Sequence, residues 1–298
     1  MAFEDYHEDY HEDYREFMAD RESMYSFLAK VFFSELSDEA IKHLATVEVA
    51  TEYGNPHIAN GLRSIRNFFM LSKADRRVQL ATEYARIFLA AGVYTQTRSV
   101  AVPYESVFTS EERLMFQDAR DEVRATYQRC GFELDVELRE PEDHLSFELE
   151  FLAHMARRSS DCIEQKRYEA FPLLIMEQKD FIEQHLLNWI PDLIQTAKRY
   201  AKNTFYPGML LITWGYLEDD CEFLEELLER EGLHAERATD QSAERATNQV
   251  VGLATDQAVG LATGQSAKRV TDQSVGQATS QVFSQTVSQV ATRRAFDG

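Results

Sequence analysis

Glycine and proline are scarce in this sequence, which has 12 glycines and 6 prolines among 298 residues. Valine and isoleucine do not dominate residues 1–230, where leucine, alanine, glutamate, arginine and phenylalanine are abundant instead. Strands favour β-branched residues, and this mixture favours helices. The composition therefore predicts an all-α protein, with 44% hydrophobic residues to build its core.

Cysteine is also rare, and the three cysteines, Cys130, Cys162 and Cys221, lie far apart. An odd number excludes a complete disulfide framework and fits free thiols in a reducing compartment. No apolar run approaches the roughly 20 residues that a membrane span needs. The N-terminus is acidic, unlike the basic start of an export signal. We therefore expect a cytoplasmic protein without stable membrane insertion.

Common catalytic motifs are missing. The sequence contains no GxxxxGK[ST], GxGxxG, HExxH or GxSxG pattern, so a phosphate-binding loop, a zinc protease helix and a nucleophile elbow are unsupported. These absences argue against an enzyme, and we expect no cofactor. A metal- or nucleotide-dependent helical enzyme remains an alternative at this point.

Negative charge is what the sequence has in excess. The net charge is −20, and residues 233–298 hold equal numbers of acidic and basic side chains, so the excess lies in residues 1–232. Such a surface repels nucleic acid phosphates and anionic lipids. It attracts basic partners and accelerates their encounter.

Three regions follow from the sequence pattern. Residues 1–16 form an acidic extension in which Glu-Asp-Tyr-His recurs, and its histidines lack a closed set of metal ligands. Residues 17–232 form one helical-bundle domain of eight or more helices. Residues 233–298 repeat Thr-x-Gln every eight residues with little apolar bulk, which predicts a disordered tail, with a small stacked solenoid as the alternative.

Apolar periodicity sets the expected helices within this domain. A helix start is expected at Ser37–Asp38 and another at Asn55–Pro56. Further helices are expected at residues 17–33, 74–89, 110–130, 142–158, 162–188, 191–203 and 207–230. Residues 90–109 lose the periodicity, and we expect a long ordered loop there, of the kind that often carries function.

The densest polar cluster lies at residues 140–150. Pro141 near a helix start would place Glu142 and Asp143 in the first turn, where they complement the helix dipole. His144 and Glu148 are then four residues apart on one face. They could bind a guanidinium or a backbone group, or simply pair with each other. A metal site of His144, Glu148, Glu150 and His154 is a weaker hypothesis, because no second matching motif exists.

Four segments in order resemble the TorD/DmsD/NarJ family of molybdoenzyme maturation chaperones. Glu140-Pro141-Glu142-Asp143-His144 resembles its E-P-x-D-H motif, and Glu83-Tyr84-Ala85-Arg86-Ile87-Phe88 resembles its E-Y-x-R-L-F helix. Pro103-Tyr104-Glu105-Ser106-Val107-Phe108 resembles its P-Y-E-S-V-Y loop. Trp189-Ile190-Pro191 with Phe205-Tyr206 resembles its C-terminal W-x-P…F-Y segment. Phe108 in place of tyrosine, the acidic repeat and the octapeptide tail depart from the family pattern.

The resemblance implies an all-helical chaperone without catalytic activity. Its partner would be the apo catalytic subunit of a molybdopterin oxidoreductase, together with that subunit's twin-arginine leader peptide. The family motifs assign Tyr104, Glu105, Ser106, Asp143 and His144 to peptide binding, and the spacing argument adds Glu140 and Glu148. An acidic adaptor for an unrelated basic protein is the other alternative, and both a monomer and a dimer are open.

The chain also carries Thr292-Arg293-Arg294-Ala295-Phe296, which looks like the core of a twin-arginine motif without the apolar run that follows in a leader. It is either a coincidence or a tethered imitation of the ligand.

Overall fold

The computed structural model describes residues 4–46, 53–72, 75–89, 91, 101–134 and 140–230, with only the backbone described for residues 4–13. These residues form ten α-helices and one 3-10 turn and contain no β-strand, which confirms the predicted all-α fold. The elements are α1 (Glu4–Phe33), α2 (Asp38–Thr46), α3 (Pro56–Leu71), α4 (Arg76–Phe88), α5 (Glu105–Thr109), α6 (Asp118–Arg129), α7 (Leu145–Glu164), η1 (Tyr168–Ala170), α8 (Phe171–His185), α9 (Ile190–Tyr200) and α10 (Phe205–Arg230).

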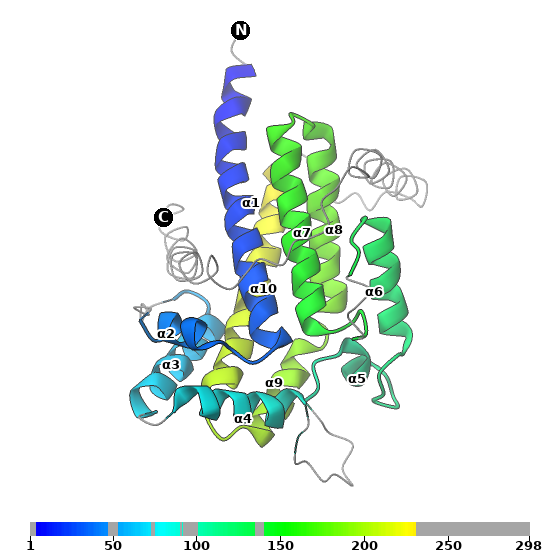
Figure 1. Ribbon diagram of the computed structural model, residues 1–298. Helices are drawn as coiled ribbons and strands as arrows, with labels where there is room; N and C mark the ends of the chain where they lie inside the picture. Colours follow the sequence, from blue (N-terminus) through cyan, green and yellow to red (C-terminus); the bar gives the residue numbers. More distant parts are fainter. Residues whose placement is uncertain are drawn as a thin grey trace, which may run out of the picture.

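The long helices form the centre of the molecule. In Figure 1, α1, α7 and α8 stand side by side, α10 passes behind them, and contacts join α1 to α7, α7 to α8 and α10 to α8. The shorter α2, α3 and α4 lie to one side, where α3 packs against α10, and α5 and α6 lie to the other. No described helix combines the length and the apolar character that a membrane crossing requires.

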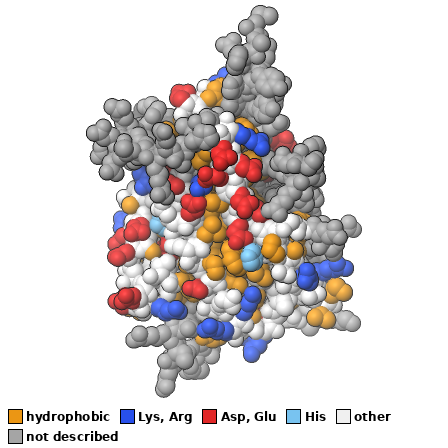
Figure 2. Space-filling view, turned by 180° about the vertical axis from the view of Figure 1, so that it is seen from behind, with side chains coloured by type: hydrophobic (Ala, Val, Ile, Leu, Met, Phe, Trp, Pro, Cys, Tyr) orange, Lys and Arg blue, Asp and Glu red, His pale blue; other side chains and the backbone are white. Residues whose placement is uncertain are grey.

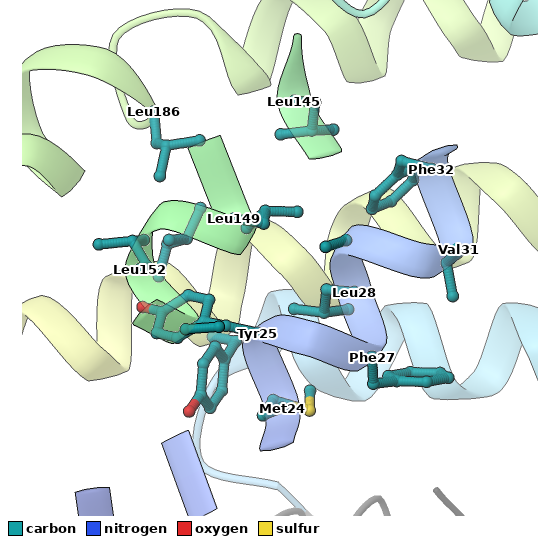
Figure 3. Packing of buried hydrophobic residues seen from close by; sticks show 14 of the residues in the cluster. Met24, Tyr25, Phe27, Leu28, Val31, Phe32, Leu145, Leu149, Leu152 and Leu186 are labelled. Carbon is teal, nitrogen blue, oxygen red and sulfur yellow. The ribbon is translucent and has the colours of Figure 1, made fainter. Parts of the chain in front are cut away.

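The core lies where α1 faces α7. Leu28 and Phe32 of α1 and Leu149 of α7 are fully buried, and Figure 3 shows side chains of the two helices interleaving beside Leu186. Residues three or four apart supply these contacts from each helix, which is the spacing that places side chains on one face. Burial of each leucine or phenylalanine stabilises the fold by about 1.5–3 kcal/mol, so the contact between α1 and α7 positions the elements around it.

A buried ion pair joins α1 to α10. Arg21 of α1 donates from Nε and Nη2 to the two carboxylate oxygens of Asp220 on α10, at 2.7 and 2.8 Å. Its Nη1 donates to Gln178 of α8 at 2.7 Å, and the Tyr25 hydroxyl donates to Asp220 at 2.5 Å. The bidentate geometry and the added donors satisfy both buried charges. The sequence pattern gave no sign of this network.

Several helix boundaries differ from the predicted ones. The predicted helix 110–130 begins only at Asp118, because Arg113 and Phe116 adopt left-handed φ angles of 53° and 63°. The predicted helix 162–188 is broken after Glu164: Lys166 has φ 55°, and Pro172 opens α8. The predicted loop 90–109 contains the short helix α5.

The acidic N-terminal repeat forms the first turns of the first helix, because α1 begins at Glu4. Residues 92–100, the octapeptide tail and the Arg293–Arg294 pair lie outside the described residues. The predicted disorder of the tail and the hypothesis of a tethered ligand imitation therefore stay predictions.

Two glycines set the close packing of α3 on α10. A Cβ atom added at Gly61 would lie 2.6 Å from the carbonyl oxygen of Gly208, and one added at Gly208 would lie 2.9 Å from that of Gly61. Backbone atoms are the obstacle in both cases, so no flexible side chain can move aside.

We expect Gly61→Ala to lower the free energy of unfolding by about 1–3 kcal/mol, because the two helices must separate to admit the methyl group. Urea denaturation measures this. Asn60→Ala, at an exposed position of the same helix, is the control and should change stability by less than about 0.5 kcal/mol. Equal effects of the two substitutions would contradict the close helix contact.

Candidate functional site

The chain segments that begin α5 and α7 lie against each other. Glu105 donates its backbone N–H to the carbonyl of Asp143 at 3.0 Å, and Leu145 donates to the carbonyl of Pro103 at 2.9 Å. Tyr104 and His144 thereby form an isolated antiparallel bridge. Two of the four family-like segments, which are far apart in sequence, therefore meet at one place.

The Asp143 and His144 side chains cap these two helices. Asp143 Oδ2 accepts from the backbone N–H of Ser106, at 2.9 Å, and also from its hydroxyl. His144 is the N-cap of α7, and its Nδ1 accepts from the backbone N–H of Ser146 at 3.2 Å. Caps of this kind satisfy donors that a helix start leaves unpaired. The prediction that α7 begins beside Pro141 with Asp143 in its first turn was wrong, because residues 141–144 form a turn closed by the His144 N–H on the Pro141 carbonyl.

Glu105 ties the short helix α5 to the corner between α8 and α9. Its carboxylate binds Nδ1 of His185 at 3.0 Å and accepts from the side-chain amide of Asn188 at 3.0 Å. Phe108, on the same helix, stacks on Trp189 with ring centroids 5.5 Å apart. Sequence reasoning missed His185 and Asn188, because no periodicity or motif marks a partner 80 residues away.

Glu148 is completely buried on the first turn of α7. Burial, followed by the nearby negative charges of Glu105 and Asp143, raises the pKa of Glu148 well above its usual range. Its side chain is thus a neutral acid under conditions that ionise an exposed glutamate. His144 binds Ser146 and not Glu148, so the predicted alternative of an internal His–Glu pair is wrong. Burial lowers the pKa of His144 to about 4, which keeps its ring neutral.

Glu140 differs from the other six predicted site residues, because it alone is exposed. Its carboxylate accepts a hydrogen bond from the Tyr104 hydroxyl. Ser106, Asp143 and Glu148 are fully buried, and the other three residues, Tyr104, Glu105 and His144, are at most 8% exposed. The structure therefore brings all seven predicted residues together. Six of them are buried, and the carboxylate of Glu140 lies at the surface.

A metal site finds no support in the described part of the chain, where no group of three or more His, Cys, Asp or Glu side chains has the arrangement to hold an ion. Glu150 is exposed, and His154 is partly buried beside Phe132.

The two remaining family-like segments also meet each other. Glu83 of α4 accepts from the backbone N–H groups of Lys202 and Asn203, just before α10 begins. The ring of Tyr84 lies against Tyr206 with centroids 5.8 Å apart. An acidic side chain thus fixes the approach to another helix start, as Asp143 does for α5.

The loop that follows α5 exposes two large apolar side chains. Residues 110–117 connect α5 to α6, and Leu114 and Phe116 in this loop are 57% and 61% exposed. The left-handed φ angles of Arg113 and Phe116 cost about 1–2 kcal/mol each. Leu114 and Phe116 stand out in the sequence as apolar residues amid charged neighbours. The predicted helix 110–130, however, gave no reason to expect them in an exposed loop.

We expect Asp143→Ala to lower the free energy of unfolding by about 1–3 kcal/mol, since it leaves the buried Ser106 donors without an acceptor. Asp143→Asn keeps an acceptor oxygen and should lose less. Urea denaturation of both variants checks this, and equal stability of the two would show that Asp143 does not act as a cap.

Glu148→Gln tests the neutral acid. A raised folded-state pKa gives stability that is complete below the unfolded pKa of about 4.3 and is lost as pH rises through the folded pKa. Glutamine imitates the neutral acid at every pH. The free energy of unfolding of the variant, relative to the unsubstituted chain, should therefore rise as the pH increases from about 4.3 toward the raised pKa of the folded state. A difference that does not change with pH would contradict the raised pKa.

Comparison with known proteins agrees with this arrangement. A family model described as nitrate reductase delta subunit matches residues 55–195, which include all seven site residues. Three relatives are named chaperone protein TorD, and each aligns with 70% of this chain. The relative from Vibrio cholerae is 29% identical with 94% of its length covered, that from Vibrio parahaemolyticus 24% with 96%, and that from Photobacterium profundum 23% with 95%. This chain is therefore similar to TorD chaperones over a large part of its length.

Proposed function

We propose that this chain matures a molybdopterin oxidoreductase in the cytoplasm by binding the apo catalytic subunit and its twin-arginine leader peptide. The leader stays bound while the cofactor is inserted, and export waits for its release. Similarity to proteins named chaperone protein TorD supports the first part of this proposal.

The exposed carboxylate of Glu140 is the observation that carries the leader-binding part. Tyr104 holds it by a hydrogen bond, and Tyr104 in turn is fixed by the backbone pairing between α5 and α7. A carboxylate oriented in this way can accept two parallel N–H bonds from a guanidinium. The buried residues beneath it support the geometry without touching the peptide.

The charge of the molecule suits a basic ligand. Acidic side chains gather on the rear face above a band of hydrophobic side chains (Figure 2), and the whole chain carries a net charge of −20. Such a field speeds the encounter with a peptide that carries two adjacent arginines, and added salt weakens it.

Calorimetric titration with twin-arginine leaders of molybdoenzymes from the same genome tests the proposal. We expect saturable binding of one leader and a loss of at least about tenfold in affinity for Glu140→Gln, since one charge-assisted hydrogen bond is worth about 1.5–3 kcal/mol. Glu229→Gln, at an exposed position near the end of α10, is the control and should bind normally.

Equal affinities of the two variants would exclude Glu140 as the arginine contact. If no leader binds, a pull-down from the native cell decides between the remaining hypotheses. A molybdoenzyme subunit without a leader would keep the chaperone function, whereas an unrelated basic protein would favour the adaptor.

A further inference from the structure

The loop of residues 110–117 presents Leu114 and Phe116 to solvent on a fixed backbone. Arg113 donates its N–H to the Ser110 carbonyl at 3.3 Å, and the Gln117 side-chain amide donates to the Met115 carbonyl at 3.2 Å. The guanidinium of Arg120 lies over the Phe116 ring, 5.5 Å from its centroid. These contacts hold the phenylalanine outward although its φ angle is 63°.

Strain and exposure point in the same direction. A left-handed φ at a bulky residue persists only where the surrounding structure enforces it, and such residues gather at binding sites. Exposing a leucine and a phenylalanine together forgoes the free energy that burying them would give. Packing of the fold explains neither feature, so a ligand is the more economical cause.

Two sets of hydrogen bonds join this loop to the chain segments that surround Glu140. Ser106, which Asp143 holds, accepts from the Gln117 N–H through its hydroxyl at 3.4 Å. Arg120, which holds Phe116, donates to both carboxylate oxygens of Glu142 at 2.6 and 3.2 Å. The loop and the segment that carries Glu140 are therefore neighbours on one rigid support.

We propose that Leu114 and Phe116 bind the apolar stretch that follows the two arginines of the client leader. The proposal rests on the proposed function and adds to it a second contact surface on the same ligand. The Arg120–Glu142 pair lies between the two surfaces, so one extended leader can contact both.

Charge selects this occupant over a second copy of the chain. Beside Arg113 and Arg120, the loop and the start of α6 carry the exposed acids Glu111, Glu112 and Asp118. A second chain with a net charge of −20 would be repelled by them. A peptide that is basic at one end and apolar at the other meets both requirements.

The test compares two double variants of the full chain. Leu114→Ser/Phe116→Asn removes the proposed surface, and asparagine tolerates the left-handed backbone. Met70→Ser/Leu71→Ser is the matched control, because these residues at the end of α3 are 64% and 81% exposed. Circular dichroism and urea denaturation verify that both variants fold.

Each variant is titrated with two peptides, the bound leader and the same leader with its apolar stretch replaced by serine and glutamine. We expect Leu114→Ser/Phe116→Asn to bind the intact leader at least tenfold more weakly, whereas the control binds it normally. The polar peptide should bind weakly and equally to all three proteins, because it never engages the loop.

Normal binding of the intact leader by Leu114→Ser/Phe116→Asn, alongside measurable binding by the unsubstituted chain, would overturn this inference and leave the proposed function intact. Absence of binding by the unsubstituted chain would overturn the leader-binding function and the inference together. Equal weakening in both double variants would also overturn the inference, since the effect would then not belong to the loop. Sedimentation of the unsubstituted chain as a dimer that Leu114→Ser/Phe116→Asn dissociates would assign the surface to self-association instead.

Discussion

The hydrogen bonds from Ser106 to the Asp143 carboxylate hold the site together. They fix the start of a five-residue helix, α5, to the turn that begins a twenty-residue helix, α7. A helix as short as α5 is marginal by itself and depends on tertiary contacts. The position of α5 therefore depends on this carboxylate, on the backbone pairing beside it and on the hydrogen bonds of Glu105 to His185 and Asn188.

Acidic residues therefore do two separate jobs in this molecule. Asp143 and Glu83 are buried or nearly so and satisfy donors at helix starts, and Glu148 is kept neutral by its surroundings. Glu140 is left at the surface, charged and oriented. Under the proposed function, the buried residues of the predicted site support the geometry of Glu140 and act on binding through the fold.

The sequence predicted the fold class well, because amphipathic periods in helices such as α3 and α7 reflect burial directly. The motifs also named seven residues that lie near one another in the structure, and their assignment to peptide binding stays a prediction. Prediction failed where backbone geometry decides the outcome. Arg113 and Lys166 have left-handed φ angles although neither is a glycine, so the sequence gave no sign of them. The turn before His144 places the start of α7 after Glu142 and Asp143. The partners of Glu105 and of Arg21 are tertiary, and local pattern contains no information about them.

The most direct test of this account is amide hydrogen exchange of the full chain with and without the client leader. If the leader binds across Glu140 and the loop, protection should increase at residues 101–120 and 140–145, while the core of α1 and α10 stays unchanged. Protection confined to the acidic second half of α10, or spread evenly over the bundle, would contradict the assignment of the site to the α5–α7 junction.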